Sequence, residues 1–317
     1  MLMRQLSTGS RSRGGNRKYR TLHKNLDHAK DFSGSLVYQG MTLISRLGRG
    51  AVLPSHDRCC MLRNVVSGRN ASESLRALRL YVRYAGRRFP NYRLYQSFVR
   101  GMHGIEIGGP SKLFRSRLPL YPVIDRLDAV NFAHRTIWEG DLKAGRRFRY
   151  YGERTGRQRI ADATDLSPLA SGSYDFVLSS NCLEHVANPL KALAEWRRVL
   201  RERGALVLVL PNQVYNFDHC RPVTAFRHLL DDLHRDVDET DLTHLDEILA
   251  LHDLSLDPPA GTLESFKARS LDNFKNRALH HHVFDLPLIK QVLLHSGFEV
   301  LHCGAAHKDL FALATRR

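Results

Sequence analysis

The forty residues from 172 to 211 constrain the fold more than any other part of the chain. A short apolar run at 176–178 is followed by small polar residues, and the Asn-Pro pair at 188–189 then marks a helix start, since asparagine caps helices and proline fits their first turn. Gly204 ends the expected helix, and the apolar run at 205–210 is typical of a strand buried on both faces. The order strand, loop, helix, strand predicts one β-α-β unit of a parallel sheet.

A second strand followed by a ligand-type loop is predicted upstream. Residues 103–107 form a short run that ends in Gly108 and Gly109, with the acidic Glu106 just before them. Glycines at such a turn let the backbone approach a ligand closely, although an ordinary tight turn has the same composition. The turn therefore indicates a ligand site only in combination with the residues that follow it.

Acidic residues follow at the spacing expected of a nucleotide-binding sheet. Asp128 lies twenty residues beyond Gly108, near the end of a strand predicted at 122–127, where a carboxylate can accept hydrogen bonds from ribose hydroxyls. Asp125 is a second candidate for this role, and the spacing favours Asp128. Asp162 is placed to follow a third strand.

These motifs resemble those of the class I S-adenosylmethionine-dependent methyltransferases, particularly the type 11 branch, over residues 104–317. The motifs that carry the resemblance are EIGGPS, ADATDL, YDFVLSSNCLEHV and LRERGALVLVLP. Pro110 and Lys112 replace two glycines of the commoner family loop, so a different loop path is expected. The resemblance implies S-adenosylmethionine as cofactor, held by Glu106, Gly108, Gly109, Asp128, Asp162, Ala163, Ser180 and Asn181.

The carboxyl-terminal segment agrees with this fold class. A helix is predicted at 285–295, and strands are predicted at 298–302 and 310–315. Members of the family close their sheet with such an antiparallel hairpin, whereas a nicotinamide-dependent dehydrogenase does not. We therefore expect an α/β fold: a doubly wound, Rossmann-like methyltransferase sheet with a closing antiparallel hairpin, a helical insert at about 212–284 and a basic amino-terminal extension.

Charge is distributed unevenly along the chain. Residues 1–100 hold 20 Lys and Arg against 4 Asp and Glu, whereas residues 101–317 are balanced at 28 to 28. The methyltransferase region, 101–317, thus gives no electrostatic reason to expect nucleic acid as substrate. We expect a disordered basic extension at 1–70, available to an anionic surface or partner, and an amphipathic helix within 71–100. The expected location is the cytoplasm, with organellar targeting by the basic segment as the alternative.

The insert is rich in histidine, which points to a polar pocket. His244 and Glu247 are three residues apart, and His281 lies in a run of three histidines. A close i, i+4 pair of histidines is missing, so we assign these residues to substrate binding together with Arg221 and predict no metal. The alternative is a metal site held by His244, Glu247, His252 and one of the histidines at 280–282.

A hydroxyl acceptor requires a general base, and two histidines are candidates for it. His219 follows the fifth strand beside Asp218, which can orient it, and His185 follows the fourth-strand loop. That loop, SSNCLE, lacks the Asn/Asp-Pro-Pro-aromatic sequence used for exocyclic amines. The expected enzyme is a methyltransferase that O-methylates a small-molecule or sugar-type hydroxyl; a non-catalytic methyltransferase-like scaffold is the alternative.

Overall fold

The computed structural model describes residues 88–317 except 139, 143 and 146. The predicted basic extension at 1–70 and nearly all of the predicted amphipathic helix lie outside these residues. Within the predicted range 71–100, the described part contains one short helix, α5 (Tyr92–Ser97), just before the first strand.

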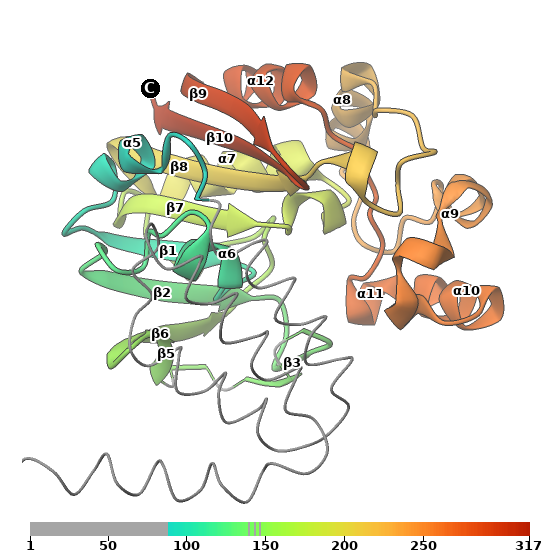
Figure 1. The fold of residues 1–317 in the computed structure, drawn as a ribbon, viewed down its shortest axis with the longest axis horizontal. Helices are drawn as coiled ribbons and strands as arrows, with labels where there is room; N and C mark the ends of the chain where they lie inside the picture. Colours follow the sequence, from blue (N-terminus) through green and yellow to red (C-terminus); the bar gives the residue numbers. More distant parts are fainter. Residues whose placement is uncertain (1–87, 139, 143, 146) are drawn as a thin grey trace, which may run out of the picture. The chain divides into compact units, whose positions relative to one another are not determined.

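An eight-stranded sheet forms the centre of the fold, in the order β5-β6-β2-β1-β7-β8-β10-β9 (Figure 1). Neighbouring strands from β6 to β8 pair in parallel, and the pairs at both edges are antiparallel. The strands are β1 (His103–Ile107), β2 (Arg126–Asn131), β5 (Arg147–Tyr151), β6 (Arg154–Ile160), β7 (Tyr174–Ser180), β8 (Leu200–Pro211), β9 (Phe298–Ala306) and β10 (Asp309–Arg316). A separate small pair consists of β3 (Arg135–Thr136) and β4 (Gly140–Asp141).

Helices cover both faces of the sheet. The remaining helices are α6 (Lys112–Ser116), α7 (Pro189–Val199), α8 (Phe226–Arg235), α9 (Leu245–Leu251), α10 (Leu263–Leu271), α11 (Asn273–Asn276) and α12 (Leu286–His295). One buried apolar cluster joins α7, α8 and α12 to the sheet, and a second joins α5 and α6 to its other face. In Figure 1, α9, α10 and α11 lie beyond the ends toward which β7 and β8 run.

The antiparallel closing hairpin confirms the predicted fold class. β10 pairs with β8 on one side and with β9 on the other, both antiparallel. The doubly wound sheet and its hairpin could be predicted because buried strands have continuous apolar runs and α12 begins at a capping aspartate, Asp285.

Two predicted boundaries were wrong. The second strand is Arg126–Asn131 rather than 122–127, because residues 119–124 form turns in which Leu120 and Ile124 are buried against the sheet. The helix α7 ends at Val199 rather than at Gly204, and the chain enters β8 at once, where the pairing with β7 is irregular around Gly204.

Gly104 shows how closely the central strands pack. It pairs with Phe176 of β7, and an added Cβ at Gly104 would lie 2.0 Å from the phenyl ring. Only glycine leaves room for that ring in the core.

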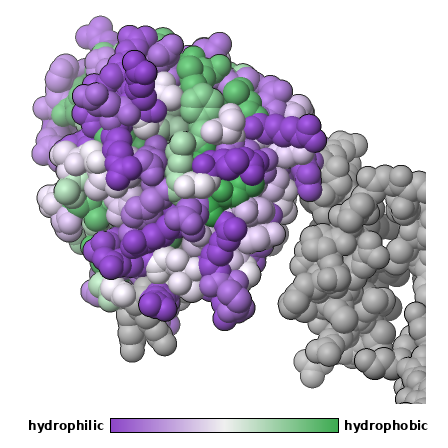
Figure 2. Space-filling view, turned by 90° about the vertical axis from the view of Figure 1, so that its left-hand side faces the viewer, coloured by the Kyte–Doolittle hydropathy of each residue, from purple (hydrophilic) through white to green (hydrophobic). Residues whose placement is uncertain are grey.

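The left-hand side of Figure 1, where β1 and β2 begin, is mostly hydrophilic, with hydrophobic residues scattered over it (Figure 2). Scattered apolar residues are normal on a protein surface and mark no binding site. Open α/β sheets bind their ligands at the opposite, carboxyl ends of the strands. None of the helices in the described part of the chain is both long and apolar enough to cross a membrane.

The closing hairpin yields a stability prediction. Leu313 of β10 is fully buried, whereas Leu301 of β9 is 39% exposed. We expect Leu313→Ala to lower the free energy of unfolding by about 2–5 kcal/mol, because it leaves a cavity in the core. The matched Leu301→Ala should cost less than about 1 kcal/mol. Equal losses in urea unfolding would contradict the position of β10 inside the sheet.

Candidate functional site

The glycine turn after β1 is held closed by Glu106. Its carboxylate is buried and accepts hydrogen bonds from the backbone N–H of Ser111 (2.9 Å) and from the hydroxyl of Tyr121 (2.6 Å). A Cβ on Gly109 would lie 2.2 Å from the Glu106 carboxyl carbon, and Gly108 has a positive φ of 78°. Both glycines are thus required by the turn itself, and Glu106 shapes the loop from inside.

At the end of the second strand the structure places Asn131 rather than Asp128. Asp128 pairs with Ile105 in the register, three residues before the strand ends. Asn131 is buried and donates from Nδ2 to the carbonyl of Gly109 (3.0 Å), which ties the strand end to the glycine turn.

Asp128 instead makes its contacts nearer the amino ends of the strands. Its carboxylate lies 3.7 Å from His103 Nε2 and accepts hydrogen bonds from the Arg157 backbone N–H and the Tyr174 hydroxyl. Burial would raise its pKa, but these donors and Arg126 outweigh burial and lower it to about 2. The structure therefore places Asp128 within the strand and not at its carboxyl end, and its contact with ribose stays a prediction. Asp125, the second candidate, precedes the strand altogether.

Asp162 follows the third parallel strand, β6, as expected. Its carboxylate accepts from the backbone N–H of Thr164 (2.9 Å) and forms an ion pair with Arg277 (3.0 Å), whose guanidinium lies over the ring of Phe132 at 5.2 Å. Ala163 is half-buried and its carbonyl accepts a hydrogen bond from Trp196 (3.1 Å). Arg277 thus joins the insert to the loops after β2 and β6.

Ser180 ends β7 and Asn181 follows it with a positive φ of 51°. The turn that follows, Leu183–His185, carries Glu184 into the interior. The groups at the carboxyl ends of β1, β2, β6 and β7 therefore include a glycine turn, an amide and a carboxylate, which fit the methionine, ribose and adenine parts of S-adenosylmethionine.

Asp218 orients His280, not the neighbouring His219. Its Oδ2 lies 2.5 Å from His280 Nδ1, whereas His219 is exposed and pairs with Asp253 at 3.0 Å. The expected pairing of Asp218 with His219 is therefore wrong, whereas the role of His219 as a base stays a prediction. Burial would lower the pKa of His280, but the Asp218 carboxylate outweighs burial and raises it.

Arg221 is buried and fully engaged by the protein. Its guanidinium donates to Asp218 Oδ1 (2.9 Å), to Glu247 Oε1 (2.9 Å) and to the carbonyl oxygens of His280 and His281 (2.8 and 3.3 Å). In the structure Arg221 thus joins residues of the protein to one another, and its role in holding substrate stays a prediction. Burial would raise the pKa of Asp218, but the charges of His280 and Arg221 lower it to about 2.

Glu184 lies beside the pair formed by Asp218 and His280, which we call the dyad. No role for this residue is predicted from the sequence. It is buried, neither carboxylate oxygen has a hydrogen-bond partner, and burial raises its pKa to about 7 although His280 opposes the shift. A small internal cavity is lined by Glu184, Asp218 and six further residues: Pro211, Gln213, Asn216, His282, Val283 and Phe284.

His185 lies in the same cluster but is tied to the backbone. Its Nδ1 lies 3.0 Å from the carbonyl of Leu279, its ring packs against His280 with centroids 4.5 Å apart, and burial holds its pKa well below the usual value. The exposed indole of Trp138 packs on its other side at 5.3 Å.

The remaining residues assigned to substrate binding are dispersed. Glu247 pairs with Arg221, and His281 is buried between Asn273 and Glu239. His244 lies instead beside His228, 2.9 Å between the two Nε2 atoms. These three side chains do not meet in one pocket.

Part of the sequence matches a known protein family. Residues 135–208 match the model of a methyltransferase domain, type 11. An uncharacterised 37.1 kDa protein in a transposon of Streptomyces fradiae is 51% identical over 45 residues, which are 14% of this chain and 13% of that protein. An uncharacterised protein of Methanocaldococcus jannaschii is 48% identical over 46 residues, 14% and 20% of the two chains. The match thus spans a fifth or less of these relatives' own length.

Solved structures also resemble the chain. One is an S-adenosylmethionine-dependent methyltransferase from Aquifex aeolicus, with 13% identity, coverage of 72% of this chain and 90% of that one, and a TM-score of 0.40. Another, from Mesorhizobium loti, has 15% identity, coverage of 72% and 96%, and a TM-score of 0.43.

Two observations indicate a methyltransferase fold. One is the strand order with its antiparallel hairpin, and the other is the family match, which covers β6, β7, α7 and most of β8. Residues 135–208 of this chain thus match a methyltransferase domain, and the sheet has the doubly wound, Rossmann-like order with an antiparallel closing hairpin.

Proposed function

We propose that the protein methylates a hydroxyl group of a small-molecule or sugar-type acceptor and that His280 is the general base. The observation that carries this proposal is the Asp218–His280 pair, which lies beside Glu184 where the fourth parallel strand, β7, ends. A non-catalytic scaffold does not require a buried acid–base pair at this position, so an enzymatic function is favoured over the scaffold.

The chain's own residues would move one proton. Asp218 accepts the Nδ1–H of His280, which fixes the tautomer and leaves Nε2 free to accept a proton from the acceptor hydroxyl. S-adenosylmethionine, when bound, supplies an electrophilic methyl group, so that an O–CH3 bond forms as the S–CH3 bond breaks. The oxygen of the acceptor gains the methyl group, and the proton remains on His280.

The surroundings of His280 favour a compact, ring-bearing acceptor. Trp138 is 51% exposed and packs on His185, which in turn packs on His280. An exposed indole offers an apolar face to a sugar or other ring, and its N–H can bond a hydroxyl. Glu184, with a pKa of about 7, can exchange protons with the same region near neutral pH.

Turnover tests this function directly. The full chain, mixed with S-adenosylmethionine and a panel of sugar and small-molecule hydroxyl compounds, should release S-adenosylhomocysteine with at least one of them. His280→Gln should slow that reaction by about 10²–10⁴-fold, because the general base is lost. The exposed His219→Gln is the matched control and should keep the rate. Loss of turnover in His219→Gln but not in His280→Gln would restore His219 as the base.

The dyad also predicts a pH effect. The base acts in its neutral form, so the rate should rise with pH through the raised pKa of His280. Asp218→Asn removes the carboxylate that raises this pKa, and the acid limb of the kcat profile should therefore move to lower pH. A histidine proton titration by NMR should show the same direction of shift. Asp253→Asn, beside His219, should leave both curves unchanged; the reverse pattern would refute the assignment.

A further inference from the structure

We propose that His228, Asp232, His244 and His282 bind a divalent transition-metal ion of the zinc class. Each residue offers one ring nitrogen or carboxylate oxygen, and these four atoms all lie within 4.8 Å of one another. His228 and Asp232 stand four residues apart on α8, His244 precedes α9, and His282 precedes α12. No two histidines of the sequence stand four residues apart; the close pair here is a histidine and an aspartate, His228 and Asp232.

The distances suit a four-coordinate ion. Donor atoms around tetrahedral zinc lie about 3.3 Å apart, since each metal–nitrogen bond is about 2.0 Å long. His228 Nε2 lies 2.9 Å from His244 Nε2 and 3.1 Å from Asp232 Oδ2. Both separations lie within a few tenths of an ångström of this value, and all four donor atoms lie within 4.8 Å of one another.

Two buried atoms of the cluster have no hydrogen-bond partner. Asp232 is 1% exposed and its Oδ2 accepts no hydrogen bond, while Oδ1 is held by Arg235 at 2.7 Å. His282 is also 1% exposed; its Nε2 lies 3.1 Å from the carbonyl of Ala187, and its Nδ1 has no partner. If His228 donates its hydrogen bond to His244, Asp232 Oδ2 and His282 Nδ1 are left without a hydrogen bond. A cation would instead bind the carboxylate oxygen and the free ring nitrogen.

Several features of the cluster are those of metal ligands. A ring nitrogen bonded to a backbone carbonyl fixes the tautomer of a ligating histidine, as Ala187 does for His282. Three imidazoles and one carboxylate suit Zn²⁺ and its first-row neighbours.

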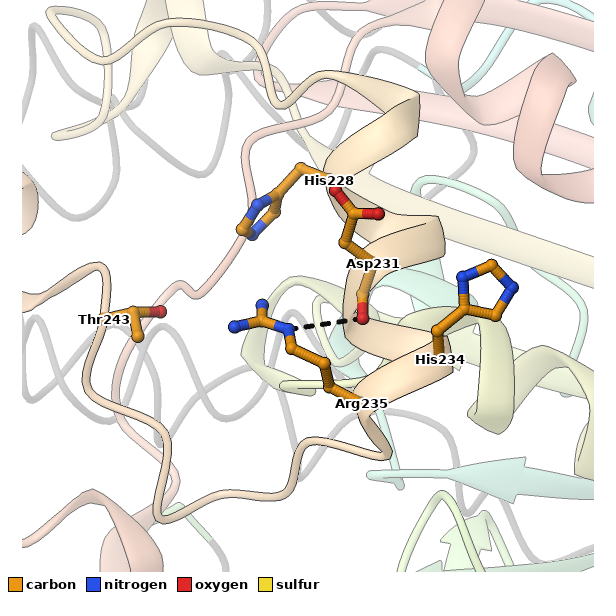
Figure 3. A pocket seen from close by; sticks show the side chains of 5 residues that line it. All are labelled: His228, Asp231, His234, Arg235 and Thr243. Atoms are coloured by element: carbon orange, nitrogen blue, oxygen red, sulfur yellow. Dashed lines mark hydrogen bonds between the residues drawn. The ribbon is translucent and has the colours of Figure 1, made fainter.

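The ion could enter from an open hollow beside the cluster. Figure 3 shows this hollow, which has a volume of about 480 Å³, with four lining side chains from α8 and Thr243 from the loop opposite. His228 belongs to both the hollow and the cluster, and His234 lines the hollow without belonging to the cluster. A bound ion would fasten α8, the start of α9 and the segment before α12 to one another, which is the action of a structural metal.

Metal content and thermal stability test this site without any methylation assay. The full chain, produced without a histidine tag, should contain about one zinc-class ion when analysed by mass spectrometry. After chelation, stoichiometric Zn²⁺ should be taken up again and raise the Tm by on the order of 5 °C. Added Co²⁺ should give the visible spectrum of a tetrahedral protein site.

Variants locate the ion. His244→Ala and Asp232→Asn should each reduce tightly held Zn²⁺ by at least tenfold and remove the Tm increase. His234→Ala, on the same helix and hollow, is the matched control and should behave like the wild type. Wild-type protein that neither contains nor regains an ion would overturn the proposal, as would equal binding by His244→Ala and Asp232→Asn. Because the wild-type measurement stands alone, a variant that fails to fold does not leave the question open.

Discussion

The arrangement of the candidate acceptor site depends on one buried guanidinium, that of Arg221. It is 3% exposed and joins Asp218, Glu247 and the carbonyls of two consecutive histidines, so it fixes the loop after β8 against the segment before α12. Removing Arg221 would leave Asp218 buried without its charge partner, which would lower the free energy of unfolding by on the order of 3–5 kcal/mol. Burial would raise the pKa of Asp218, but the charges of His280 and Arg221 together lower it and hold Asp218 in its charged form, so the ion pair with Arg221 supports the acid–base pair.

The sheet could be predicted because its sequence signals are local. The apolar runs of β7 and β8, the Asn188 cap of α7 and the hairpin of β9 and β10 each depend on neighbours along the chain. The second strand shows the limit of such signals. Pro122, Val123 and Ile124 are apolar and strand-like in composition, yet they precede the strand, which begins at Arg126. Asp128 therefore lies within the strand and not at its end.

The acceptor site could not be predicted because its partners lie far apart in the sequence. Asp218 lies 62 residues from His280, and chain adjacency favoured His219 instead. Glu184 carried no signal beyond its place after the fourth-strand loop, since its raised pKa arises from burial by segments of the insert. The i, i+4 spacing of His228 and Asp232 was visible in the sequence, but its two other partners, His244 and His282, come together only in the fold.

Calorimetric titration of the full chain with S-adenosylhomocysteine tests the central claim, that the loops at the carboxyl ends of β1, β2 and β7 hold the cofactor. We predict saturable one-to-one binding, weakened about tenfold or more by Asn131→Ala, because that amide lies at the strand end beside the glycine turn. Asp128→Asn, whose carboxylate lies at the far ends of the strands, should bind like the wild type. Folded wild-type protein that binds nothing, or binding lost in Asp128→Asn but kept in Asn131→Ala, would contradict this position of the site.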